Sequence, residues 1–127
     1  MDYAGLLRAV EAGRTPPVVL VHGAEPVLLD DAVAAVTRAL FADPDMAALS
    51  REVLEAREAG AETIVRSALT LPFLSERRLV VVRGADGLGV RQGEALAAYA
   101  AAPNPSTVLL LLAAGGRYAG RFVRLAA

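Results

Sequence analysis

Three uninterrupted apolar runs dominate the pattern of hydrophobic and polar positions along the chain. They lie within residues 18–21, 79–83 and 107–113, where only the end residues Arg83 and Thr107 are polar, and none of them alternates between apolar and polar side chains. Strands whose residues are apolar on both faces are typical of a parallel sheet that is covered by helices on both sides. We therefore expect these three runs to be core strands.

The stretches between the runs have the spacing of amphipathic helices, which we expect over residues 3–12, from Pro26 to about residue 40, and over about residues 91–101. The second helix carries an apolar stripe of Leu29, Val33, Val36 and Leu40, with Asp30, Asp31 and Arg38 on its other side, and the third turns Leu96 and Tyr99 inward. Strands that alternate with helices predict a three-layer α/β fold with a parallel sheet.

Residues 46–70 allow two interpretations. One is a single long helix that Gly60 interrupts. The other is a short edge strand over residues 51–54, a turn ending at Gly60, and a helix over about residues 61–70 in which Ile64, Ala68 and Leu71 face inward. The second is preferred, because the alternation of strands and helices requires a strand here.

The composition excludes much catalytic chemistry. The 127 residues are 55% hydrophobic with a net charge of −1, which suits one folded domain over residues 1–127 and disfavours disorder or free-standing nucleic-acid binding. All 13 basic residues are arginine, so the chain has no P-loop or Schiff-base lysine. It also has no cysteine and one histidine, His22, which argues against metal clusters.

The two ends of the chain bear on where the protein is located and on whether the sequence is part of a longer chain. The start lacks a signal peptide, and the longest apolar run, residues 108–114, is too short to cross a bilayer. These features predict a soluble cytoplasmic protein without membrane contact. Residues 117–125 resemble the beginning of a basic amphipathic helix, so we expect a fragment of a longer chain.

The turn after the first apolar run occupies the place of a phosphate-binding loop. Gly23, Ala24 and Glu25 stand there with no lysine, and Glu25 would repel a triphosphate at the start of the following helix. The turn is therefore interpreted as a degenerate phosphate-loop position. A hydrolase site fails as well, because no serine lies in a G-x-S-x-G elbow. We expect no catalytic residue, no metal and no cofactor.

The connection Leu71-Pro72-Phe73-Leu74-Ser75-Glu76 is unusual because it places large apolar side chains after a proline. Two interpretations are open. Phe73 and Leu74 pack under the edge of the sheet, or they project as a hydrophobic anchor for a partner.

Three segments together carry a family resemblance: Pro17 to Leu29 with its G-x-E turn, Leu71 to Val82 with the stretch LPFLSERRL, and Pro105 to Leu112. In this order and spacing, they resemble the N-terminal domain of the delta subunit of bacterial DNA polymerase III, a clamp-loader subunit. The resemblance covers essentially the whole chain. It implies a three-layer parallel sheet of the P-loop NTPase/AAA+ type whose nucleotide site is degenerate, with the family's helical lid and collar domains absent from residues 1–127.

The resemblance also implies a function and a site. Family members bind the DNA sliding clamp (the beta subunit) and open the ring, so that it can be loaded onto primed DNA. Carried over by position, Phe73 and Leu74 enter a pocket of the clamp, within a binding segment of Leu71, Pro72, Phe73, Leu74 and Ser75. The other loader subunits, delta-prime and gamma/tau, would be contacted through the absent domains, and DNA only indirectly.

Two points stay open. Arg77 either touches an acidic rim of the clamp or, like Arg78, lies at a solvated strand start with its stem packed on the sheet edge. The alternative function is an α/β nucleotide-binding or hydrolase-like domain whose catalytic residues lie downstream of residue 127.

Overall fold

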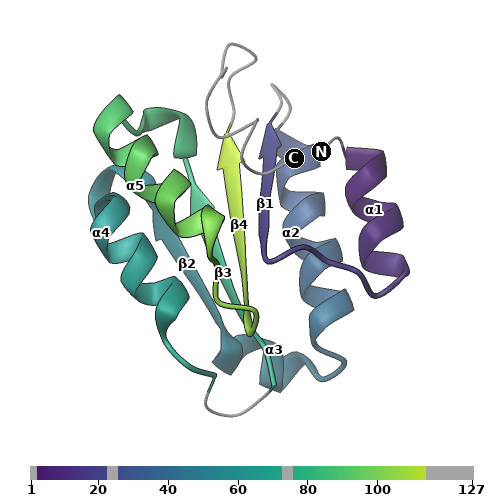
Figure 1. Cartoon of the computed structure of the whole chain (residues 1–127). Coiled ribbons are helices and arrows are strands. Elements are labelled where there is room, and N and C mark those ends of the chain that lie inside the picture. The colour runs from purple at the N-terminus through teal and green to yellow at the C-terminus, as the bar shows by residue number, and fades with distance from the viewer. Residues whose placement is uncertain (1–2, 23–25, 73–75, 114–127) are drawn as a thin grey trace.

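The computed structural model describes residues 3–22, 26–72 and 76–113. Its elements are α1 (Tyr3–Glu11), β1 (Val18–His22), α2 (Pro26–Leu40), α3 (Pro44–Ser50), β2 (Arg51–Glu55), α4 (Ala56–Leu69), β3 (Arg78–Arg83), a short 3₁₀ turn (Ala85–Gly87), α5 (Val90–Ala101) and β4 (Thr107–Ala113). The strands form one parallel sheet with helices on both faces (Figure 1). The predicted three-layer α/β fold is confirmed.

The order of the strands in the sheet is β1-β4-β3-β2. In the centre of the sheet, Leu110 of β4 pairs with Val19 on one side and with Val81 of β3 on the other. β3 and β4 therefore have neighbours on both edges and helices on both faces, which accounts for their uninterrupted apolar sequences. β2 lies at an edge, and its charged residues are the ones that an edge strand tolerates.

Successive residues of the central strands point into two separate core layers. Leu109 and Leu111 pack with α4 and α5, whereas Val108 and Leu110 pack with α1, α2 and α3 on the opposite face. This follows from the period of two in a strand. Each fully buried leucine or valine contributes about 1.5–3 kcal/mol relative to an exposed one, so the sheet is the main stabilising element.

Residues 46–70 follow the preferred interpretation, an edge strand and then a helix. Two details differ from it. Asp43 accepts a hydrogen bond from the backbone N–H of Asp45 at 2.9 Å and caps α3, with Pro44 in its first turn, so the residues that end α2 also start a new helix. In addition, α4 begins at Ala56 and kinks at Gly60, where φ is 75°.

The expectation for Leu71 was wrong. Ile64 and Ala68 are buried as expected, but Leu71 is 75% exposed. The physical reason is that α4 ends at Leu69 and Thr70 is extended, so the helical spacing that links residues 64 and 68 does not reach residue 71. The other predicted strands and helices match the observed ones to within one residue at each end.

Within the described ranges, no helix has both the length and the apolar character that would let it span a bilayer.

Candidate protein interaction surface

The connection between α4 and β3 lies at the amino-terminal edge of the sheet, which here means the end at which the strands begin. Because the strands are parallel, β2, β3 and β4 all begin at this edge, and α3 runs directly into β2 there (Figure 1). Of the predicted binding segment, Leu71 and Pro72 belong to this edge, while Phe73, Leu74 and Ser75 lie outside the described residues.

A cleft of about 120 Å³ opens between α3 and this connection. It is lined by Leu49, Ser50, Thr70, Leu71, Pro72, Arg77 and Arg78. The cleft therefore joins residues that are more than 20 positions apart in the sequence, and it includes three of the residues that the sequence singled out, Leu71, Pro72 and Arg77.

Large apolar side chains are exposed around the cleft. Leu49 is 67% exposed and Leu71 is 75% exposed, and Leu69, two residues before Leu71, is 55% exposed. Exposed apolar side chains that gather at one place, next to charged residues, are a feature of protein-binding surfaces. Arg77 is partly buried and lines the same cleft as Leu49 and Leu71.

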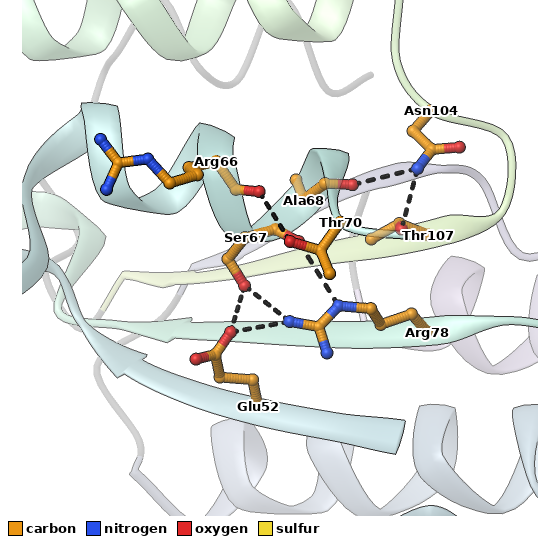
Figure 2. Close-up of polar contacts among 8 residues, drawn as sticks. All are labelled: Glu52, Arg66, Ser67, Ala68, Thr70, Arg78, Asn104 and Thr107. Atoms are coloured by element: carbon orange, nitrogen blue, oxygen red, sulfur yellow. Dashed lines mark hydrogen bonds and ion pairs between the residues drawn. The ribbon is translucent and has the colours of Figure 1, made fainter. Parts of the chain in front are cut away.

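A polar network underlies the connection (Figure 2). The guanidinium of Arg78 donates to the carboxylate of Glu52 at 2.8 Å and to the hydroxyl of Ser67 at 3.0 Å, and its Nε donates to the backbone carbonyl of Ser67 at 3.4 Å. The Ser67 hydroxyl donates in turn to Glu52. The network joins β2, α4 and β3, and it leaves the Arg78 side chain only 17% exposed.

The carboxyl end of α4 is held by further hydrogen bonds. Thr70 donates from its hydroxyl to the Arg66 carbonyl at 3.0 Å and from its backbone N–H to the Ser67 carbonyl at 3.1 Å. Asn104, in the connection between α5 and β4, donates to the Ala68 carbonyl at 3.2 Å. These carbonyls have no partner within the helix, so the contacts satisfy them and fix the point where the chain leaves α4.

The expectation that Arg78 lies at a solvated strand start was wrong. Its neighbours in the sequence gave no sign of a partner, because Glu52 and Ser67 are 26 and 11 positions away. Sequence reasoning also missed Leu49, which falls in a segment that the preferred interpretation left without a helix. An arginine at the start of an otherwise apolar strand was the one available signal for the network.

The residues that flank the predicted phosphate-loop position lie at the opposite edge of the sheet, where the strands end. β1 ends there at His22 and α2 begins at Pro26; Gly23, Ala24 and Glu25 lie outside the described residues. At this edge Arg83 of β3 forms an exposed ion pair with Asp30 of α2 at 3.0 Å. His22 and Arg83, where β1 and β3 end, are therefore a strand length away from Leu71 and Pro72.

Comparison with known proteins gives a consistent family. The family model described as DNA polymerase III, delta subunit, matches residues 20–123. The DNA polymerase III subunit delta of Bacillus subtilis is 31% identical over 114 residues, which cover 84% of this chain and 33% of that protein. The chain thus spans about a third of the length of this curated relative.

Solved structures share the fold. The Bacillus subtilis DNA clamp loader delta protein superimposes with a TM-score of 0.80 at 24% identity, covering 97% of this chain and 39% of that one. A DNA polymerase III gamma subunit-related protein of Thermotoga maritima gives a TM-score of 0.70 at 14% identity, with 96% of this chain and 42% of that one covered. These likenesses support the AAA+-like fold class. Since the family model covers most of the sequence, the chain belongs to the DNA polymerase III delta subunit family.

Proposed function

We propose that this chain is the clamp-binding domain of a clamp-loader delta subunit. In this proposal, residues 1–127 form a single AAA+-like domain that binds the sliding clamp, the beta subunit, through Leu71, Pro72, Phe73, Leu74 and Ser75. Arg77 lies beside them and contacts the rim of the clamp. Binding opens the ring for loading onto primed DNA during replication.

The observation that carries the proposal is the exposure of Leu71, at 75%, beside Pro72 and across a cleft from the exposed Leu49. A leucine in water forgoes the roughly 1.5–3 kcal/mol that its burial would contribute. A protein surface that covers it would recover this free energy. The family resemblance supports the same edge, because the apolar connection is one of the two most specific pieces of that resemblance.

Binding alone can open a ring only through a difference in affinity. If the domain binds the open clamp more tightly than the closed clamp, it shifts the equilibrium toward the open form by that difference. No chemical step is required of this chain. The sequence without lysine fits this role, since ATP would be bound and hydrolysed by other subunits. We assign the contacts with delta-prime and gamma/tau to regions outside residues 1–127, and we propose no cofactor.

The direct test is the affinity of the chain for its own clamp, with the double substitution Phe73→Ala/Leu74→Ala. We expect binding to weaken by at least roughly 3 kcal/mol, because two anchors are removed. The matched control is Val27→Ala/Val90→Ala, which truncates two side chains exposed to 65% and 69% elsewhere. Circular dichroism verifies that both variants are folded.

The control variant should bind like the natural chain. Equal binding by Phe73→Ala/Leu74→Ala and the natural chain would move the clamp-binding surface elsewhere. Binding of a nucleoside triphosphate by the chain itself would instead favour the alternative, a nucleotide-binding domain.

A further inference from the structure

We propose that Arg78 is a positioning residue that presets the connection between α4 and β3 for binding. This inference rests on the proposed function, because it assigns a role to a residue that supports the clamp-binding segment without contacting the clamp. Its basis is the network that Arg78 forms with Glu52 and Ser67 (Figure 2).

The network ties together the two ends of the connection. The chain leaves α4 at Leu69 and enters β3 at Arg78. Ser67, in the last turn of α4, receives two hydrogen bonds from Arg78, one at its hydroxyl and one at its carbonyl. Because residues 67 and 78 are bonded directly, the start and the end of the intervening chain are held at a fixed separation.

Glu52 fixes both ends to the sheet. It lies in the edge strand β2, where it accepts from the Arg78 guanidinium at 2.8 Å and from the Ser67 hydroxyl. β2 also pairs directly with β3, with Glu52 in register with Val80. The pairing of β2 with β3 therefore positions the Glu52 carboxylate, and through its hydrogen bond with Ser67 the carboxylate holds the end of α4 against the sheet.

The chemistry of this contact requires arginine. A planar guanidinium offers donors on Nε and on its terminal nitrogens, so it reaches the Ser67 carbonyl and the Glu52 carboxylate together. A lysine ammonium would keep the charge but could not reproduce both directions. The cation also lies at the carboxyl end of α4, where the helix dipole favours positive charge.

Arg78 lines the cleft, but the donors of its guanidinium are engaged by Glu52 and Ser67 within the chain. Its side chain is 17% exposed and is directed at Glu52 and Ser67, whereas the apolar side chains of Leu71 and Leu49 are exposed on the surface. Fixing the two ends of the connection before binding avoids part of the conformational entropy cost of association. Arg78 would therefore increase affinity without adding a contact.

The experiment compares Arg78→Lys with the natural chain in clamp binding by calorimetry. We expect the dissociation constant to rise roughly five- to tenfold, since an ordering cost then appears on binding. The matched control is Arg83→Lys, which alters the exposed Arg83–Asp30 ion pair at the other end of the same strand and should leave clamp affinity unchanged. Glu52→Gln is a second variant that should weaken binding in the same direction.

The double substitution Arg78→Lys/Glu52→Gln in the chain distinguishes positioning from contact. Because both residues act through one hydrogen-bonded network, the double variant should bind the clamp about as tightly as the weaker of the two single variants. A further readout is hydrogen exchange in the free chain. The Thr70 amide, which donates to the Ser67 carbonyl, should exchange faster in Arg78→Lys, while the amides of β4 keep their protection.

Three outcomes would overturn the inference. Arg78→Lys and Glu52→Gln both bind as tightly as the natural chain, or Arg83→Lys weakens binding as much as Arg78→Lys does, or the losses from Arg78→Lys and Glu52→Gln add up in the double variant. If the natural chain itself does not bind the clamp, the proposed function fails together with this inference. If the natural chain binds and one of the three outcomes is found, only the role of Arg78 fails. If Arg78→Lys does not fold, Glu52→Gln alone decides.

Discussion

At the residue scale, Tyr99 shows how burial changes an ionisable group. Its side chain packs into the core between α4, α5 and the sheet. Burial raises the pKa of the Tyr99 phenol above its ordinary value of 10.0, although the hydrogen bond from the Asn104 backbone N–H, at 3.2 Å, acts in the opposite direction. The neutral phenol is therefore the form that the folded chain favours.

This pKa shift predicts a loss of stability in alkaline solution. In the unfolded chain Tyr99 loses its proton near pH 10, while the folded chain retains it to higher pH. The folded state then binds more protons, so the free energy of unfolding is undiminished below pH 10 and falls as the pH rises from there through the folded pKa. Urea unfolding as a function of pH would measure the fall.

The control for this prediction is Tyr99→Phe, which removes the titrating group. At neutral pH it should cost about 1 kcal/mol, because the Asn104 N–H loses its acceptor. Above pH 10 its unfolding free energy should decline less steeply than that of the natural chain. Because the chain has three tyrosines, the tyrosinate absorbance of Tyr99 is taken as the difference between the natural chain and Tyr99→Phe. Parallel declines in the two proteins would contradict the assignment.

At the scale of elements, the kink in α4 depends on one glycine. Gly60 has a φ of 75°, in the left-handed region, and the next residue, Ala61, donates its backbone N–H to the side chain of Gln92 in α5 at 2.9 Å. The kink lets the second half of α4 begin anew against α5. A residue with a Cβ would be strained at position 60, whatever space surrounds it.

We expect Gly60→Ala to destabilise the fold by about 1 kcal/mol or more. The substitution adds backbone strain, and the new Cβ would also lie 3.4 Å from the Gln92 amide oxygen. Gly89→Ala is the comparison variant: Gly89 has a φ of −78° and no atom within 4 Å of the added Cβ, so alanine there loses only the preference of the α5 N-cap for glycine. Thermal unfolding of the two variants measures the difference. Equal midpoints would show that the left-handed backbone is not required.

At the scale of the whole molecule, the fold buries some leucines in the core and exposes others on the surface. Leu110 is fully buried at the centre of the sheet, whereas Leu71 is 75% exposed beside the cleft at its edge. The two side chains are chemically identical, so their substitutions separate the two roles.

Leu110→Ala should lower the free energy of unfolding by about 2–5 kcal/mol, because it leaves a cavity between two packed layers. Leu71→Ala should change the unfolding free energy by less than about 0.5 kcal/mol and should weaken clamp binding instead. Urea denaturation and clamp calorimetry on both variants test the contrast. A large stability loss in Leu71→Ala would indicate that Leu71 belongs to the core and would remove it from the binding surface.

The sequence alone determined the layers, the strands and the family. Uninterrupted apolar runs fixed β1, β3 and β4, since only a doubly covered parallel strand is apolar on both faces. The order of the motifs, from the G-x-E turn to LPFLSERRL, predicted the delta subunit family, which the comparisons confirm.

The tertiary structure decided where the connections lead and what supports them. The exposure of Leu71, the start of α3 at Pro44 and the network of Glu52, Ser67 and Arg78 all depend on where the helix ends fall against the sheet. Local spacing cannot specify such contacts, because the partners are brought together by strand order and register over tens of residues. The spacing of apolar residues predicts which positions are buried, whereas distant polar side chains such as Glu52 and Arg78 become partners only when the sheet has assembled.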